Sequence, residues 1–258
     1  MKRKVFLAFA GAMIAGASFA SVSASNIVCR IAISSVETNT IVSLPLVDIG
    51  VPGVSTINAT NYVLTVGLKA GDRLLQKTAN DDGVFEYQGW TLLTDGGEWT
   101  AVTLSSSSIT VPALQSAVFQ RGGALMLSRT DPESSNPFYL LGQVATDPIE
   151  VSPVAGTRTM MANMLPYPVD ILDLPYKDGT SPATLDVISV PTAFNGENLY
   201  WTVPTSGGKA TWCRNQRVNR RNSYVAVEQG TVVVPAGTGF WYMSAGSTVP
   251  TFKWQYEE

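Results

Sequence analysis

Gly71-Asp72-Arg73-Leu74-Leu75-Gln76 is followed 125 positions later by the similar stretch Gly196-Glu197-Asn198-Leu199-Tyr200-Trp201. A second pair of anchors, Val111-Pro112-Ala113 and Val234-Pro235-Ala236, lies 123 positions apart. Two nearly equal offsets of this size are the sequence signature of an internal repeat. The sequence therefore predicts two copies of one structural unit.

Short segments rich in β-branched and aromatic residues fill both copies, and Gly, Pro, Asn and Asp bound them. Examples are residues 62–66, 84–87, 108–111, 231–234 and 252–256. Asp82-Gly83 and Gly207-Gly208 supply the positive φ values that hairpin turns need. Past the first 24 residues, no window keeps a helical apolar period for three turns. We therefore expect an all-β protein.

The boundary between the copies is expected near Thr146-Asp147-Pro148. This places a first β-repeat at residues 25–146 and a second at 147–258. Each length suits a compact β-sandwich or β-barrel. The alternative is one larger pseudo-twofold barrel built from both halves.

Residues 1–24 have the features of a secretory signal peptide. Met1-Lys2-Arg3-Lys4 is cationic, residues 5–20 are apolar and broken by glycines, and small residues follow. No later stretch approaches the roughly 20 apolar residues of a membrane span. We expect an exported chain, in the periplasm, at the cell surface or outside the cell, with no transmembrane segment in its mature form.

The charge balance disfavours nucleic acid as a partner. Loss of Lys2, Arg3 and Lys4 with the signal peptide leaves 14 basic against 20 acidic residues, a net charge of −6. A polyanion repels such a chain. Only 14% of the residues are charged, against roughly 25% in typical soluble domains. This low charge suggests that another copy or the cell envelope covers part of the surface.

Two cysteines, Cys29 and Cys213, are present. In an oxidising compartment a disulfide between them would join the mature N-terminus to the second copy and close a very long loop. The rival interpretation is two separate thiols.

The chain contains no histidine, so Ser-His-Asp, Cys-His and His-rich metal sites are excluded. The stretch Val-Val-Val-Pro-Ala-Gly-Thr-Gly at 232–239 resembles the strand-turn-strand segment of cupins. In that family the turn leads to a metal-binding histidine, whereas Phe240, Trp241 and Tyr242 follow here. We therefore expect no metal, no cofactor and no catalytic residue.

Carboxylates offer the remaining enzymatic alternative, a hydrolase using two acidic side chains. The candidates in the first copy are Asp81, Asp82, Glu86, Asp95 and Glu98. The second copy has Ser206, Gly207 and Thr211 in the positions aligned with Asp81, Asp82 and Glu86. An Asn-Asp-Asp-Gly stretch is also typical of a solvated hairpin tip, and it lacks an ordered calcium-loop spacing.

Tyr200, Trp201 and Trp212 fall on facing strands of the second predicted hairpin. Exposed Trp and Tyr rings form platforms for sugars and for protein anchors, although β-proteins also bury such rings. Trp201 is the ring most expected to face solvent, because the first copy has Gln76 at the aligned position.

The densest charge run holds four arginines interleaved with amides: Arg214, Arg217, Arg220 and Arg221. Forked guanidinium donors grip carboxylate, sulfate or phosphate. The run fits such a contact, a solubilising loop, or a salt bridge to the other copy.

Residues 230–242 resemble the Pro-x-Gly-x-Gly-Phe-Trp signature of an uncharacterised group of exported bacterial β-proteins. The first copy departs from it at Leu114, Ser116 and Ala117. The resemblance implies export and β-structure, and it implies no mechanism.

Together these observations predict an exported, non-enzymatic binding or structural protein of the bacterial surface or periplasm. Its partner would be a glycan, a cell-envelope protein or a second copy of itself. The alternatives are a carbohydrate-binding module using the exposed Trp and Tyr side chains, and a carboxylate-based hydrolase.

Overall fold

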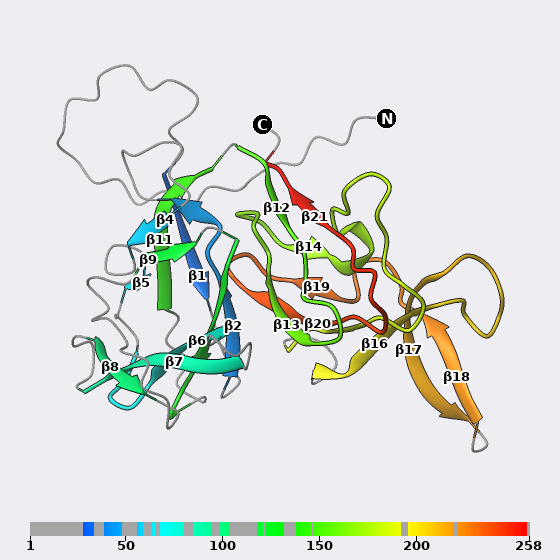
Figure 1. Ribbon diagram of the computed structural model, residues 1–258, viewed down its shortest axis with the longest axis horizontal. Helices are drawn as coiled ribbons and strands as arrows, with labels where there is room; N and C mark the ends of the chain where they lie inside the picture. The colour runs from blue at the N-terminus through cyan, green and yellow to red at the C-terminus, as the bar shows by residue number, and fades with distance from the viewer. Residues whose placement is uncertain are drawn as a thin grey trace.

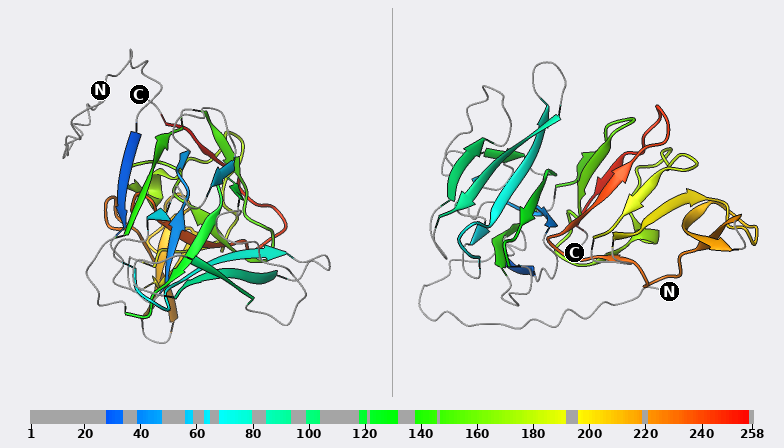
Figure 2. Two further views of the ribbon diagram at one scale, coloured as in Figure 1. Left: turned by 90° about the vertical axis from the view of Figure 1, so that its left-hand side faces the viewer. Right: turned by 90° about the horizontal axis from the view of Figure 1, so that it is seen from below.

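The computed structural model describes most of the chain beyond residue 27. Its described residues are 28–33, 39–47, 56–58, 63–64, 68–79, 85–93, 99–103, 118–120, 122–131, 138–145, 147–191, 196–218 and 221–256. The predicted signal peptide, Arg220, Asp81 and Asp82 lie outside these ranges. The fold is all-β, as the sequence predicts, and Figure 1 and the right-hand view of Figure 2 show it as two lobes.

The first lobe, called the first unit, holds the strands before residue 145. They are β1 (Val28–Ile33), β2 (Asn39–Ser43), β3 (Leu46–Val47), β4 (Thr56–Asn58), β5 (Val63–Leu64), β6 (Arg73–Ala79), β7 (Phe85–Leu92), β8 (Trp99–Thr103), β9 (Val118–Gln120), β10 (Ala124–Ser128) and β11 (Phe138–Val144).

The second unit holds the strands from residue 149 onward and one short 3₁₀ helix, η2 (Ile171–Asp173). Its strands are β12 (Ile149–Val151), β13 (Arg158–Ala162), β14 (Val169–Asp170), β15 (Val187–Ser189), β16 (Asn198–Thr202), β17 (Thr211–Val218), β18 (Arg221–Ala226), β19 (Val233–Val234), β20 (Gly239–Met243) and β21 (Phe252–Trp254).

Both units use nested antiparallel pairs. In the first unit β1 pairs with β11, β2 with β10, β4 with β9 and β6 with β7. In the second unit β12 pairs with β21, β13 with β20, β14 with β19 and β15 with β16. This nesting of early strands on late ones is the pairing of a jelly roll, a two-sheet form of β-sandwich.

The main sheet of the first unit has the order β2-β10-β6-β7-β8, and that of the second has the order β13-β20-β15-β16-β17-β18. The second sheet therefore carries one strand more, β18, at its edge. The β17–β18 ribbon projects from the rest of the lobe at the lower right of Figure 1. Thr205 exchanges two hydrogen bonds with the backbone of Tyr224, so the 203–210 loop covers part of the β18 edge.

A buried aspartate closes the same turn in each unit. The Asp72 carboxylate accepts from the backbone N–H of Lys69 at 3.0 Å and of Thr130 at 2.8 Å. The Asp186 carboxylate accepts from Ala183 N at 2.9 Å and from Ala245 N at 2.7 Å. In both cases the donors lie three residues before the aspartate and two residues after the end of β10 or β20. Asp72 and Asp186 therefore occupy corresponding positions.

This correspondence differs from the one the sequence predicted. Gly71 (φ 89°) corresponds to Leu185 (φ 70°), the one non-glycine with positive φ among the described residues, and not to Gly196. The strand pairs agree, because Leu92 lies opposite Trp99 and Trp201 lies opposite Trp212. The predicted alignment was therefore shifted, and the structure matches β7 with β16 and β8 with β17.

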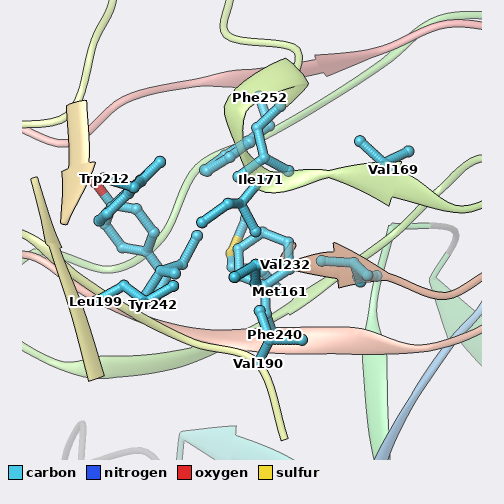
Figure 3. Close-up of a cluster of buried hydrophobic side chains, with 14 of the residues drawn as sticks. Met161, Val169, Ile171, Val190, Leu199, Trp212, Val232, Phe240, Tyr242 and Phe252 are labelled. Carbon is cyan, nitrogen blue, oxygen red and sulfur yellow. The ribbon is translucent and has the colours of Figure 1, made fainter. Parts of the chain in front are cut away.

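Each unit has its own core, and the two cores meet. The first is built from aliphatic side chains around Trp90, and the second is richer in aromatic side chains. Figure 3 shows the second, where Trp212, Tyr242, Phe240 and Phe252 pack over aliphatic neighbours. Alternation along the strands sends these rings inward.

The contact between the units, called the seam, is reciprocal. A Cβ on Gly122, in the β9–β10 turn, would lie 2.8 Å from Ile149 of β12. A Cβ on Gly237, in the β19–β20 turn, would lie 2.8 Å from Ile31 of β1. Both glycines have positive φ, and each turn packs on the first strand of the other unit. This is the two-way contact of an isologous interface, here within one chain.

Candidate functional site

The candidate site is the outer face of the six-stranded sheet. Alternation along β20 shows which side of the sheet is the outer one: Phe240 and Tyr242 are buried, whereas Trp241 is half-buried and Met243 is 42% exposed. Residues opposite each other across antiparallel strands share a face. Trp241 lies opposite Ser189, and Ser189 lies opposite Asn198.

A second row runs beside the first. Arg158 lies opposite Met243, Met243 opposite Val187, and Val187 opposite Tyr200. The central strand, β15, contributes only Val187 and Ser189 here, and both are buried. Because small side chains lie between larger ones, the face is dented above β15.

The dent is a hollow of about 100 Å³, called the outer-face hollow. Its lining residues are Arg158, Val187, Ser189, Asn198, Trp241 and Met243. The Arg158 guanidinium carbon lies 4.6 Å from the centroid of the Trp241 ring. This is a cation–π distance, so the ring orients the charge. The Ser189 hydroxyl donates to Gly196 O at 2.6 Å and fixes the floor.

Comparisons with family models, with curated proteins and with solved structures found no match. Among the residues the structure describes, no helix is long and apolar enough to cross a bilayer. His, Cys, Asp and Glu side chains form no group of three or more suited to a metal ion in these ranges.

The structure corrects part of the predicted aromatic platform. Trp212 is fully buried, and Trp201 packs against it with ring centroids 5.3 Å apart. Trp201 also contacts Tyr176 at the edge of the second core. The prediction that Trp201 faces solvent relied on Gln76, but the strand pairing places apolar Leu92 at its corresponding position. Trp212 therefore cannot serve as an exposed platform, and the half-buried Trp201 packs on the core side of the sheet.

Tyr200 does lie on the outer face, beside the hollow. It is half-buried, and its ring meets that of Tyr224 edge-on at 5.9 Å. Of the three predicted aromatic residues, Tyr200 lies on this face, and its aromatic neighbour across the hollow is Trp241.

The arginine run is a hairpin of two strands instead of a loop. The Arg214 guanidinium donates to the Glu197 carboxylate at 2.8 Å, and the two side chains form an ion pair within the second unit. Arg217 and Arg221 are exposed on β17 and β18. Arg214 and Arg217 point to opposite faces of the ribbon, because they are three positions apart on one strand. The structure does not gather them into one anion grip.

The predicted disulfide is not formed, because Cys213 is a free, fully buried thiol. Cys29 is in β1 and Cys213 in β17, strands that lie in different lobes in Figure 1. Burial raises the pKa of the Cys213 thiol. The sulfur lies 3.6 Å from the carbonyl oxygens of Thr202 and Thr211. The rival interpretation, a separate buried thiol, describes Cys213.

The buried acidic groups hold the backbone together. Asp170 caps η2 by accepting from Leu172 N at 2.8 Å and also accepts from Gly230 N. Asp186 accepts from the Tyr242 hydroxyl in addition to its two backbone donors. Burial raises the pKa of Tyr242 and of Tyr176 far above the ordinary value.

Sequence reasoning did not single out Arg158, Ser189, Asn198 or Trp241 as site residues. A usable signal existed for Trp241, since a ring between inward-facing Phe240 and Tyr242 must face outward. The others required the pairing of β13, β20, β15 and β16, which joins segments up to 85 residues apart and which no local pattern specifies.

Proposed function

We propose that this chain is an exported, non-enzymatic binding protein of two jelly-roll copies, and that the outer face of the second copy receives its ligand. The observation that carries the proposal is the outer-face hollow, where an aromatic ring, a guanidinium and an amide converge. Binding sites commonly combine apolar walls with a few placed polar groups.

Export is supported by the cationic start and apolar stretch within residues 1–24. The low charged fraction fits a protein held against other envelope components. A free thiol is compatible with that location, because Cys213 is fully buried and so is shielded from oxidants.

A binding role is favoured over catalysis because the buried acidic and aromatic residues have structural roles. Phe240, at the position where cupins carry a metal ligand, is buried in the core (Figure 3). Asp72, Asp170 and Asp186 are buried and accept backbone N–H groups, which are structural roles. The hydrolase alternative rests on Asp81, Asp82 and Glu86, whose side chains lie outside the described residues.

The outer face differs between the two units. By strand pairing, Met126 holds the place of Trp241, and Asn39 holds that of Arg158. The first unit therefore lacks the aromatic and cationic pair, and the proposed site belongs to the second unit.

A glycan array probed with the mature chain, residues 25–258, tests the proposal. Wild type should give saturable hits, Trp241→Ala should lose them, and Met126→Ala should keep them. Hits that survive Trp241→Ala would place the site elsewhere. A blank array together with a concentration-dependent oligomer would replace glycan binding by self-association.

A further inference from the structure

We propose that the outer-face hollow receives the acetamido group of an N-acetylhexosamine unit within a polysaccharide. This inference rests on the proposed function and specifies its ligand. Three observations support it: the size of the hollow, the apolar and polar groups that line it, and its place in the sheet.

The size of the hollow limits what can enter. Its volume of about 100 Å³ is below the roughly 300 Å³ of pockets that enclose whole small molecules. At about 30 Å³ for a group the size of a water molecule, the hollow holds on the order of three such groups. The acetyl part of an acetamido group has this size, since it consists of a carbonyl carbon, its oxygen and a methyl group. One such substituent therefore fits, and the sugar ring that carries it must lie across the sheet surface.

The hollow has an apolar side that suits the methyl group. Val187, Trp241 and Met243 supply it. Arg158 stacks on the Trp241 ring and has a further partner, so it forms a fixed wall and its N–H donors have no part in the proposed contact. A methyl group that lies against these side chains leaves water, and a hydroxyl group at the same position of the sugar lacks this contact.

Two polar side chains at the hollow match the two polar atoms of an acetamido group. Asn198 is an exposed lining residue, and its amide can donate to the acetamido carbonyl oxygen. The Ser189 hydroxyl donates its proton to Gly196 O at 2.6 Å, so its oxygen can accept from the acetamido N–H. The hollow thus offers a separate contact to the methyl group, the carbonyl oxygen and the N–H of one substituent.

The place of the hollow in the sheet favours a sugar over an acetylated peptide. The hollow lies over β15, which has β20 on one side and β16 on the other. The backbone of β15 is engaged in both ladders, so a peptide strand finds no edge to pair with there. Side chains alone must hold the ligand. Tyr200, on the neighbouring strand and the same face, offers a ring for the apolar face of an adjoining sugar.

Titration of the mature chain with tri-N-acetylchitotriose and with cellotriose, followed by tryptophan fluorescence and calorimetry, tests the inference. The two trisaccharides share their linkage and differ only at one ring carbon of each unit, which carries an acetamido group in the first and a hydroxyl group in the second. Tri-N-acetylchitotriose should bind at least about tenfold more tightly, a difference of about 1.4 kcal/mol. The reason is that only its acetyl group can fill the hollow.

Asn198→Asp replaces the amide donor by a carboxylate of the same shape, which only accepts hydrogen bonds. It should remove at least about tenfold of the affinity for tri-N-acetylchitotriose, because the carboxylate repels the acetyl oxygen. It should spare cellotriose, whose hydroxyl group can donate to the carboxylate. An unchanged unfolding temperature verifies the fold, and Asn198 is exposed.

The matched control is Asn222→Asp, which makes the same change at an exposed position of the edge strand β18. It should alter both affinities less than about twofold, because salt screens a charge at that distance from the ligand. An acetyl preference that survives Asn198→Asp, or equal losses in the two variants, would overturn the inference.

The acetyl methyl protons of the ligand give a direct readout. In the bound trisaccharide one acetyl methyl resonance should shift, because the ring current of Trp241 acts on a methyl group inside the hollow. Magnetisation transferred from the protein should reach that methyl group more strongly than the protons of the sugar rings. Acetyl resonances that keep their free positions while the trisaccharide is bound would overturn the inference.

The two proposals fail in different ways. Equal affinity for both trisaccharides, lost in Trp241→Ala, would overturn the acetamido assignment and leave a sugar-binding face. Tight binding of a peptide that carries an N-acetyl group, with no binding of tri-N-acetylchitotriose, would also overturn it. No binding of any glycan, in the titration or on the array, would overturn both.

Discussion

Adding a single methyl group at the seam should reveal how tightly the two units are joined. Gly122→Ala and Gly237→Ala each place a Cβ 2.8 Å from an isoleucine carbon of the other unit. Both positions also have positive φ, which costs a side chain roughly 1 to 2 kcal/mol. Overpacking adds about 1 to 3 kcal/mol. Each substitution should therefore destabilise the protein by about 2 to 5 kcal/mol.

Gly207→Ala is the matched control, because its φ of 91° equals that of Gly122 and nothing lies within 4 Å of its added Cβ. It should show the conformational cost alone, about 1 to 2 kcal/mol. Urea unfolding followed by tryptophan fluorescence gives all three values. At roughly 2 to 4 °C per kcal/mol for a chain of this size, thermal melts should separate the seam variants from the control. Equal losses of stability in all three variants would contradict the close packing of Gly122 and Gly237 on the other unit.

Three other perturbations have defined outcomes. Leu185→Gly should raise the free energy of unfolding, measured with urea, by roughly 0.5 kcal/mol, because it relieves a left-handed φ at a side chain that is 47% exposed. A loss above 1 kcal/mol would contradict the correspondence between Leu185 and Gly71. The raised pKa of Tyr242 contributes stability that is complete below about pH 10, the unfolded value, and is lost as the pH rises toward the folded value. Tyr242→Phe should therefore cost about 1 to 3 kcal/mol at pH 7 and flatten the fall in stability above pH 10, and a fall as steep as in wild type would argue against this. In a Cys29→Ser background the Cys213 thiol should react with a thiol reagent only after urea unfolding, whereas rapid labelling of the native protein would show that it is accessible.

The fold class was predictable because its signals are local. The predicted strand segments at residues 62–66, 84–87, 231–234 and 252–256 overlap β5, β7, β19 and β21. In contrast, β17 continues into the arginine run, which the sequence did not predict to be a strand. Gly207 and Gly208 have the predicted positive φ values, although they lie within the 203–210 loop between β16 and β17 and not in a two-residue turn. These features depend on neighbours in sequence, so one chain is enough to infer them.

The correspondence between the two units was not predictable from the Gly71 and Gly196 anchors. Position 71 needs a left-handed residue that the second unit supplies as Leu185, so a search for matching glycines finds the wrong partner. Buried Asp72 and Asp186 share a role that depends on donors 58 and 59 residues away. The error at Trp201 followed from that shift.

The site residues also differ in whether a local sequence signal could identify them. Tyr200 and Trp212 were both predicted as ligand-binding residues, but Tyr200 is half-buried and Trp212 is fully buried, and half-buried and fully buried rings look alike in a strand pattern. Arg158 became a site residue through its contact with Trp241, 83 positions later. Only the closing of β13 onto β20 brings the two together.

The central claim is that the outer face of the second unit is the binding surface. Indole N–H resonances of the six tryptophans, recorded while a glycan that the mature chain binds on the array is added, test it most directly. The account predicts a saturable shift of the Trp241 resonance, assigned through Trp241→Phe, with the buried Trp212 and Trp254 resonances unchanged. Unchanged Trp241 in the presence of a bound glycan, or shifts centred on Trp201, would contradict it.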